Sequence, residues 1–296
     1  MTRPIQFKVA ALVARPDADR IAGTLETLYH YLVNRGVKVL VERKSSKALK
    51  GLNPEVRELE ALGEDCDFAL IVGGDGTLLA AARTLAPFDI PLIGVNLGRL
   101  GFLADILPEH LEKRLGEVLD GRFDLEERFM LEAQIKRDEA VVFRQTAVND
   151  VVIHRSSTTG MLEIVTHIDT VFLNSQRSDG LIISTPTGST AYALSAGGPI
   201  LSPSLQAIVL APVNPHALSN RPIVVESECV IGISFKKGKQ FGARLVCDNI
   251  QSPPIEVNDR IEVRKAARPF RLLHPPGYDF YEILRAKLNW SSGTQA

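Results

Sequence analysis

Five adjacent residues carry the first chemistry that the sequence suggests: Gly73, Gly74, Asp75, Gly76 and Thr77, within IVGGDGTLLAAARTL. An apolar run that stops at glycines and resumes with helical spacing is typical of a strand followed by a helix. The start of a helix offers unpaired N–H groups and a positive dipole end to an anion. Glycines at this point lack the Cβ atoms that would keep a phosphate away from the backbone. The segment therefore predicts a phosphate cradle with one carboxylate at its rim and a hydroxyl in the first helical turn.

The position of Asp75 limits what its carboxylate can do. A helix N-terminus stabilises the charged form, which suits a group that orients a hydroxyl for phosphoryl transfer, because the loose transition state of that reaction does not need early deprotonation. The segment is not a P-loop, and Leu79 stands where a dinucleotide fingerprint needs its third glycine. The alternative is that Asp75 only caps the helix. A cap does not require two preceding glycines, so the functional interpretation is favoured.

Further polar residues lie between apolar runs in the second half of the chain. The segment TPTGSTAYALSAGG combines hydroxyls, glycine turns and the ring of Tyr192, which suits hydrogen bonds to a ribose and contact with a planar base. Its alternative is a glycine-rich hairpin with a buried tyrosine. From residue type alone, Asn149 and Asp150 favour an Asx-type turn before a strand. Arg177 could contact a phosphate or form an ordinary ion pair.

The elements that position these residues fall into two patterns. Strands alternate with helices over the first 105 residues, which predicts a doubly wound parallel sheet. After one more helix, short β-branched segments separated by turns predict a β-sandwich-like domain. Helical spacing returns in YDFYEILRAKLNW. We therefore expect an α/β phosphate-donor domain over 1–105, with 271–296 packing back on it, and a mainly β domain over 106–270.

Composition excludes several classes of protein. The 34 Lys and Arg residues and 35 Asp and Glu residues leave a net charge of −1, so no overall basic field indicates a nucleic-acid partner. Three scattered cysteines suit neither a disulfide framework nor a CxxC metal site, and none of the six histidines has metal-ligand spacing. No apolar run is long enough for a membrane span. We expect a cytoplasmic protein without a metal held by its own side chains.

At GGDGT the sequence resembles the NAD kinase family, the ATP-NAD kinases of bacterial type, and more distantly the diacylglycerol and sphingosine kinases. Four further blocks resemble NAD kinases, in the family's order: NLGRLGFL, NDVVIH, SDGLIISTPTGSTAYALSAGGPI and HALSNRPIV. The resemblance covers nearly the whole chain, and the long third block is its most specific part. It implies transfer of the γ-phosphate of ATP, with a divalent cation such as Mg²⁺, to the 2′-hydroxyl of the adenosine ribose of NAD, giving NADP.

The resemblance also implies roles for single residues. Asp75 matches the acid regarded in the family as the proton acceptor, and Gly73, Gly74, Gly76 and Thr77 would hold the phosphates of ATP. The residues expected to bind NAD are Asn149, Asp150, Arg177, Asp179, Thr190, Ala191, Tyr192, Ser195 and Gln251. Among them Arg177 is included because it lies two residues before Asp179. Gln251 has Asn249 as its alternative, because the chain reads CDNIQ where the family has an Asp-Gly-Gln turn.

Two other functions share some of these features. A lipid kinase with the same turn would need an amphipathic basic helix or a long apolar surface, which the sequence does not provide. A module that binds NAD or NADP without turnover would not need the acid at position 75. Members of the resembled family are homodimers or homotetramers built through the β domain, so we expect self-association. The sequence leaves open whether polyphosphate replaces ATP as the donor.

Overall fold

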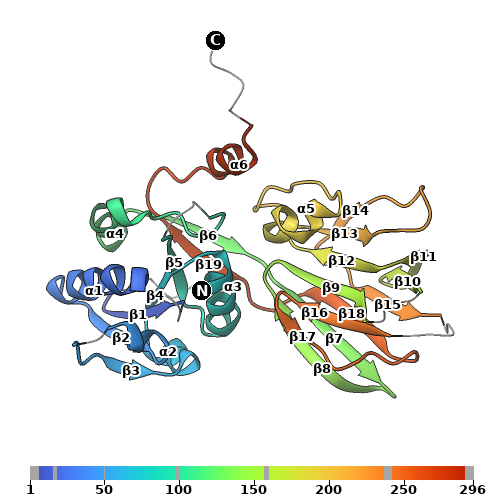
Figure 1. The fold of residues 1–296 in the computed structure, drawn as a ribbon, viewed down its shortest axis with the longest axis horizontal. Helices are drawn as coiled ribbons and strands as arrows, with labels where there is room; N and C mark the ends of the chain where they lie inside the picture. The colour runs from blue at the N-terminus through green and yellow to red at the C-terminus, as the bar shows by residue number, and fades with distance from the viewer. Residues whose placement is uncertain are drawn as a thin grey trace, which may run out of the picture. The chain divides into compact units, whose positions relative to one another are not determined.

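The protein, described here from a computed structural model, divides into two compact units (Figure 1). The first unit comprises Met1–Glu127 and Phe270–Ala296, and the second comprises Arg128–Pro269. The structure describes residues 7–15, 19–49, 51–97, 101–156, 160–236 and 242–290. Over these ranges, none of the helices is both long and apolar enough to cross a membrane.

The first unit is built on one parallel sheet. In its described part the sheet has seven strands in the order β3-β2-β1-β4-β5-β19-β6, and the pairs from β3 to β19 are parallel. The strands are β1 (Val9–Ala14), β2 (Lys38–Glu42), β3 (Glu55–Arg57), β4 (Phe68–Val72), β5 (Pro91–Val95), β6 (Asp124–Arg128) and β19 (Phe270–His274). The helices are α1 (Asp19–Asn34), α2 (Leu59–Asp65), α3 (Asp75–Leu85), α4 (Leu111–Leu119) and α6 (Phe280–Leu288), with 3-10 turns η1 (Ser45–Ala48), η2 (Ala86–Phe88) and η3 (Pro108–His110).

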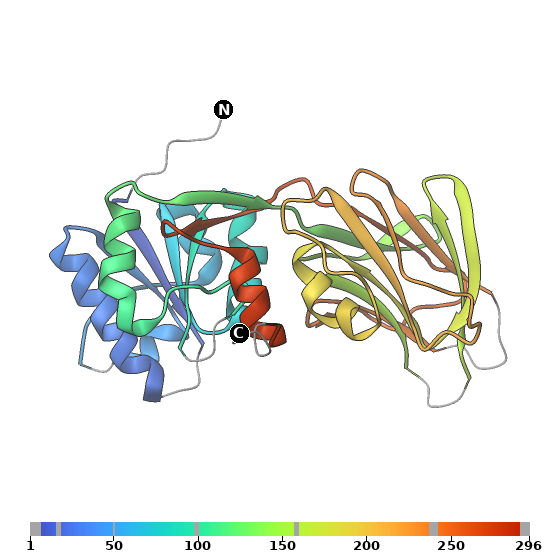
Figure 2. The ribbon, with the colours of Figure 1, turned by 90° about the horizontal axis from the view of Figure 1, so that it is seen from above.

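Helices cover both faces of this sheet. Figures 1 and 2 show α1 and α4 on one face and α2 and α3 on the other. The alternation of strand side chains produces this arrangement, since Leu12 of β1 packs with Leu25 of α1 and Leu115 of α4 in one core. Because both faces are covered, the central strands are continuous apolar runs, as in FALIV of β4. The predicted doubly wound α/β fold is confirmed.

Three segments differ from the pattern read in the sequence. PEVRELEAL reads as one charged helix, but Glu55–Arg57 pairs with β2 as an edge strand and helix α2 begins only at Leu59. Strand β6 joins the sheet beside β19. Helix α4 buries Leu111, Leu115 and Val118 in the same core as α1. The first unit therefore does not end at residue 105 but continues through α4 and β6 to Glu127.

The second unit is an antiparallel sandwich, as predicted. Its described part forms two six-stranded sheets, β11-β10-β15-β18-β7-β8 and β14-β13-β12-β9-β16-β17. The strands are β7 (Leu131–Arg137), β8 (Ala140–Ala147), β9 (Asp150–Arg155), β10 (Leu162–Ile168), β11 (Val171–Ser178), β12 (Gly180–Ser184), β13 (Ala207–Val213), β14 (Ile223–Glu226), β15 (Ile231–Phe235), β16 (Ala243–Cys247), β17 (Ile250–Gln251) and β18 (Arg260–Lys265).

Strand β12 is buried on both faces, which explains its all-apolar run. Leu181 and Ile183 face the core between the two sheets. Ile182 faces the other way, into a smaller cluster with Ala193 of helix α5 (Tyr192–Ser195). Together with the 3-10 turn η4 (Thr187–Thr190), α5 therefore forms a polar segment anchored on the outer face of the second sheet (Figure 1).

Candidate active site

The glycine-acid turn lies between β4 and α3, where the sequence predicts it. Gly73 donates its N–H to the carbonyl of Val95 at 2.9 Å. A Cβ atom at Gly73 would lie 2.6 Å from Oγ1 of Thr77, so this position requires glycine. Gly74 is the N-cap residue and Asp75 is the first residue of α3. The alternative reading of Asp75 as the N-cap is therefore wrong, and its carboxylate is available for another role.

The carboxylate of Asp75 is held by the segment that follows β5. The N–H of Phe102 donates to Oδ2 at 3.1 Å, and the N–H of Leu103 donates to Oδ1 at 3.2 Å. A Cβ atom at Gly101 would lie 2.3 Å from Oδ1, so the carboxylate can occupy this position only beside a glycine. Each carboxylate oxygen keeps accepting capacity for a substrate hydroxyl. Residues 98–100 of the predicted NLGRLGFL block lie outside the described residues.

The start of α3 is open on its outer side. Gly74 and Gly76 are exposed, and a Cβ atom at either would meet nothing within 4 Å. In the described chain the N–H groups of Asp75 and Gly76 have no acceptor, as is usual in the first turn of a helix. These donors form the positive end of the helix dipole. The arrangement suits a phosphate group beside a fixed carboxylate.

In the second unit, Asn149 and Asp150 are held by a residue that the sequence did not single out. The carboxylate of Asp248 accepts the backbone N–H groups of Val148, Asn149 and Asp150 at 3.0, 2.9 and 3.3 Å. Asp248 has a φ of 49° and opens the two-residue turn between β16 and β17. The CDNIQ segment therefore contributes its acid to this group. Its only sequence signal is the Asp of the family's Asp-Gly-Gln turn.

Asp150 is itself an acid in an unfavourable setting for charge. It is buried, and the carboxylate of Asp248 lies close by. Burial and, secondarily, the charge of Asp248 raise the pKa of Asp150 to about 7. At neutral pH its carboxyl group can therefore either donate or accept a hydrogen bond.

The polar segment after β12 lies directly against Asn149. The carbonyl of Asn149 accepts the N–H of Thr185 at 2.9 Å. A Cβ atom at Gly188 would lie 2.2 Å from the same carbonyl oxygen, so turn η4 needs glycine there. The structure thus brings together Asn149, Asp150 and the residues of the TPTGSTAY segment, which are separated by more than thirty residues in the chain.

Four predicted residues of this segment are at least partly accessible. Thr190 and Ala191 are half-buried, Ser195 is exposed and Tyr192 is 47% exposed. The alternative of a hairpin with a buried tyrosine is therefore wrong. The buried side chain is that of Ala193, which anchors α5 on the sheet and leaves the ring of Tyr192 facing outward.

Arg177 and Asp179 lie at the other end of β12. The carboxylate of Asp179 pairs with Nε of Arg155 at 3.0 Å and accepts Nδ2 of Asn214 at 3.0 Å. Asp179 lies five positions before Ser184, which is near Asn149, and five steps along a strand span roughly 17 Å. Arg177 is exposed on β11. Within a single copy of the chain, Arg177 and Asp179 therefore lie apart from the group around Asn149.

Gln251 lies near that group without contributing to its hydrogen bonds in the described residues. It is exposed on β17, where it pairs with Val246 of β16. Asn249 is also exposed. Asp248 is the member of the CDNIQ segment that contacts residues 148–150. In the described ranges, no three His, Cys, Asp or Glu side chains gather as a metal-binding group.

Comparison with known proteins identifies relatives over nearly the whole chain. The ATP-NAD kinase N-terminal domain matches residues 10–123, and the ATP-NAD kinase C-terminal domain matches residues 148–275. The NAD kinase of Methylococcus capsulatus is 52% identical over 294 residues, which cover 98% of this chain and 99% of that protein. The NAD kinase of Alcanivorax borkumensis is 44% identical over 289 residues, covering 97% and 95%.

Solved structures show the same fold. Yeast NADH kinase complexed with NADH superposes with a TM-score of 0.89 at 24% identity, over 99% of this chain and 90% of that one. An NAD kinase from Archaeoglobus fulgidus in complex with ATP has a TM-score of 0.72 at 25% identity, over 94% of this chain and 99% of that one.

Proposed function

The chain belongs to the ATP-NAD kinase family, and on that premise we propose that it transfers the γ-phosphate of ATP to the 2′-hydroxyl of the adenosine ribose of NAD, forming NADP and ADP. The observation that carries the proposal is the Asp75 carboxylate, fixed by two backbone N–H groups beside the open start of α3. A positioned acid next to free helix N–H groups matches what phosphoryl transfer needs.

The donor phosphates would bind at the glycine-acid turn. The exposed backbone of Gly74 and Gly76 lets a phosphate approach the N–H groups of the first turn. The carboxylate of Asp75 would accept the hydrogen bond of the attacking hydroxyl and take its proton as the new P–O bond forms. A divalent cation such as Mg²⁺ would be held by the phosphates, by water and by at most the Asp75 carboxylate. When bound, it offsets charge on the β- and γ-phosphates.

NAD would bind through the second unit's polar group. Asn149 and the buried carboxyl of Asp150 supply hydrogen-bond donors and acceptors that suit ribose hydroxyls and base nitrogens. The exposed ring of Tyr192 would lie against a base, with Thr190, Ala191 and Ser195 beside it. Gln251, near the Asn149 group, would contact NAD from its exposed position on β17. Arg177 and Asp179 lie away from Asn149, so they would contact the NAD held there only if they came from a second copy of the chain.

An assay with purified protein, ATP, Mg²⁺ and NAD tests the proposal, with NADP detected by a strictly NADP-dependent dehydrogenase. We expect NADP from the wild type and a drop in kcat of at least about 100-fold for Asp75→Asn, since positioned acid-base groups contribute about that much. The asparagine still accepts one N–H bond, so the variant should stay folded. Full activity in a folded Asp75→Asn variant would contradict the role of Asp75.

A wild type that binds NAD but forms no NADP would reject the reaction itself. Polyphosphate would then replace ATP in the assay, followed by diacylglycerol or a sphingoid base as acceptor. Circular dichroism and NAD titration of both proteins are the controls, because they separate loss of chemistry from loss of fold or binding.

We also propose that the chain forms homo-oligomers through its second unit. Strand β11 is an edge strand, and its Val171 and Phe172 side chains are 68% and 58% exposed. Apolar side chains on an exposed strand edge favour association with another surface.

A further inference from the structure

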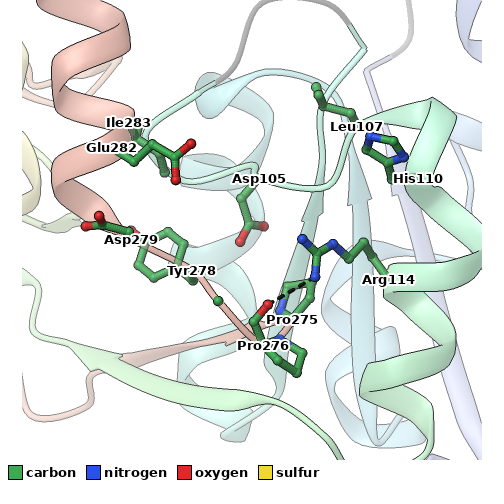
Figure 3. A pocket seen from close by; sticks show the side chains of 11 residues that line it. Asp105, Leu107, His110, Arg114, Pro275, Pro276, Tyr278, Asp279, Glu282 and Ile283 are labelled. Carbon is green, nitrogen blue, oxygen red and sulfur yellow. Dashed lines mark hydrogen bonds between the residues drawn. The ribbon is translucent and has the colours of Figure 1, made fainter. Parts of the chain in front are cut away.

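A pocket of about 270 Å³ lies within the first unit, beyond the carboxyl ends of β5 and β19 (Figure 3). Its walls come from the segment after β5, from η3 and α4, from the segment between β19 and α6, and from the first turn of α6. The polar side chains that line it are Asp105, His110, Arg114, Tyr278, Asp279 and Glu282. Apolar contact is available from Leu107, Pro276 and Ile283. Ligands of open α/β sheets bind at this edge.

The inner wall of the pocket combines an acceptor and a donor. Oδ2 of Asp105 lies 2.9 Å from Nδ1 of His274, whereas Oδ1 has no hydrogen-bond partner among the described residues. Figure 3 shows the Asp105 carboxylate and the Arg114 guanidinium pointing into the same space. Nη1 of Arg114 donates to the carbonyl of Pro276 at 3.0 Å and to the carboxylate of Glu117 at 3.3 Å. The other N–H groups of the guanidinium can donate to a ligand in the pocket.

The ring of Tyr278 forms a fixed flat wall. It stacks on His274 with ring centroids 3.7 Å apart and an interplanar angle of 11°. His274 is buried, and its Nε2 lies 3.1 Å from a carboxylate oxygen of Glu126. Burial opposes the charged imidazolium, but the hydrogen bonds that it donates to the two carboxylates outweigh this effect and raise the pKa of His274. The tyrosine ring is thus held against a buried histidine that two carboxylates fix in place.

These walls select the kind of ligand. A free phosphate would meet the carboxylates of Asp105, Asp279 and Glu282, so an anionic group is disfavoured. A flat heterocycle with an exocyclic amine and ring nitrogens fits better. Its amine would donate to Asp105, its ring nitrogens would accept from Arg114, and an attached sugar hydroxyl would donate to Glu282. With a volume just below the range of about 300–1,000 Å³ for ligand pockets, the space suits one nucleoside rather than a dinucleotide.

The pocket is connected to the proposed catalytic acid through one short segment. Leu103 donates its N–H to Asp75 at 3.2 Å, and Asp105 is only two residues further along the chain. Two residues span at most about 7 Å. Helix α6 packs on the same segment, where the ring centroids of Phe280 and Phe102 lie 6.3 Å apart. A nucleoside in the pocket would therefore lie within reach of Asp75 for a phosphate chain attached to it.

We propose that this pocket binds the adenosine moiety of the phosphate donor. The inference rests on the proposed function for the identity of the donor. NAD also contains adenosine. The two possible ligands are distinguished by measuring which substrate, the phosphate donor or NAD, binds more weakly when the pocket is filled.

The test fills the pocket from an exposed position. Glu282 is exposed in the first turn of α6, so Glu282→Trp places an indole in the pocket without touching the core. Tyr281→Trp is the matched control, because Tyr281 is 56% exposed on the same helix and does not line the pocket. The Kd for ADP and the Kd for NAD are measured by calorimetry for the wild type and both variants, and KM is measured for both substrates.

We expect Glu282→Trp to raise the Kd for ADP and the KM for ATP by at least about tenfold, with kcat and the KM for NAD nearly unchanged. Adenosine should inhibit the wild type competitively with ATP and lose potency against Glu282→Trp, whereas inhibition by inorganic tripolyphosphate should not change. Tyr281→Trp should behave like the wild type.

Unchanged ADP binding in folded Glu282→Trp would overturn the proposal, as would a selective rise in the KM for NAD. A wild type that binds ADP in this pocket-dependent way but forms no NADP would reject the proposed reaction and leave the pocket assignment standing. If the wild type forms NADP and Glu282→Trp keeps the KM for ATP of the wild type, the proposed reaction stands and the pocket assignment is rejected.

Discussion

Gly101 determines the position that the Asp75 carboxylate can occupy. A methyl group at position 101 would lie 2.3 Å from Oδ1 of Asp75, so Gly101→Ala must push the carboxylate away from the N–H groups of Phe102 and Leu103. A displacement of about 1 Å at a reacting group can reduce the rate by about 100-fold. We expect kcat to fall by about that factor, with little change in the KM for NAD. Steady-state kinetics of the purified variant measure both.

The control for Gly101→Ala is Gly23→Ala. Gly23 lies in helix α1, and a Cβ atom there would meet nothing within 4 Å. Alanine should stabilise the helix by about 0.5–1 kcal/mol and leave kcat unchanged. Equal activity in the two variants would show that the position of Asp75 does not depend on residue 101.

Asp150 should make stability depend on pH. Its pKa is raised to about 7 by burial and by Asp248, so the folded chain keeps a proton that the unfolded chain releases from about pH 4 upward. The contribution of Asp150 is therefore fully present below pH 4 and is lost as pH rises towards 7. Asp150→Asn should flatten the dependence of Tm on pH over this window and raise Tm at pH 8, while weakening NAD binding.

Thermal unfolding at half-unit steps from pH 4 to pH 8 measures this effect. Asp138→Asn is the matched control, because Asp138 is exposed in the turn between β7 and β8. Parallel Tm curves for wild type and Asp150→Asn would contradict the prediction. The size of the effect is on the order of a few kcal/mol, given about 1.4 kcal/mol for each pKa unit.

The chemistry of single residues was predictable where it lies in adjacent positions. Asp75 and its glycines form one short motif, so the proposal of a phosphate site could be drawn from their residue types. The N–H groups that hold Asp75 belong to Phe102 and Leu103, and any residue type provides a backbone N–H. Asp248 holds residues that lie almost a hundred positions earlier. Neither contact can be read from local sequence, although the family's Asp-Gly-Gln turn marks the position of Asp248.

Turn η4 and the start of β9 act together as one structural element of the proposed NAD site. Gly188 in η4 lies against the carbonyl of Asn149, so Gly188→Ala would separate the two. Overpacking of this kind costs about 1–3 kcal/mol. We expect the KM for NAD to rise by about tenfold, equivalent to about 1.4 kcal/mol, with a smaller change in the KM for ATP.

Gly116→Ala is a control for Gly188→Ala, since it also introduces a close contact but lies in the first unit. Its Cβ atom would lie 2.8 Å from the hydroxyl of Tyr31, the movable end of a side chain. A similar rise in the KM for NAD in both variants would indicate general destabilisation and contradict a local effect at Asn149.

Elements were predicted best where burial repeats along them. The apolar strands β1, β4 and β5 and the amphipathic helix α1 were all expected from their hydrophobic patterns. Strands with little burial were missed. β6 is DLEER and β8 is AVVFRQTA, both largely exposed, and they are strands because their backbones pair with neighbours. In β6, tertiary pairing of this kind overrides residue preference, because Asp and Glu are depleted in strands.

At the level of the whole molecule, the exposed edge of β11 predicts self-association. Val171 and Phe172 are 68% and 58% exposed, and a carboxylate there would have to be desolvated in any interface. We expect Phe172→Asp to reduce the native mass measured by light scattering after size exclusion. Val33→Asp is the control, because Val33 is 47% exposed on α1 of the first unit. An unchanged mass would contradict the role of β11. If association also completes the NAD site with Arg177 and Asp179 from a second copy, Phe172→Asp should raise the KM for NAD as the oligomer dissociates.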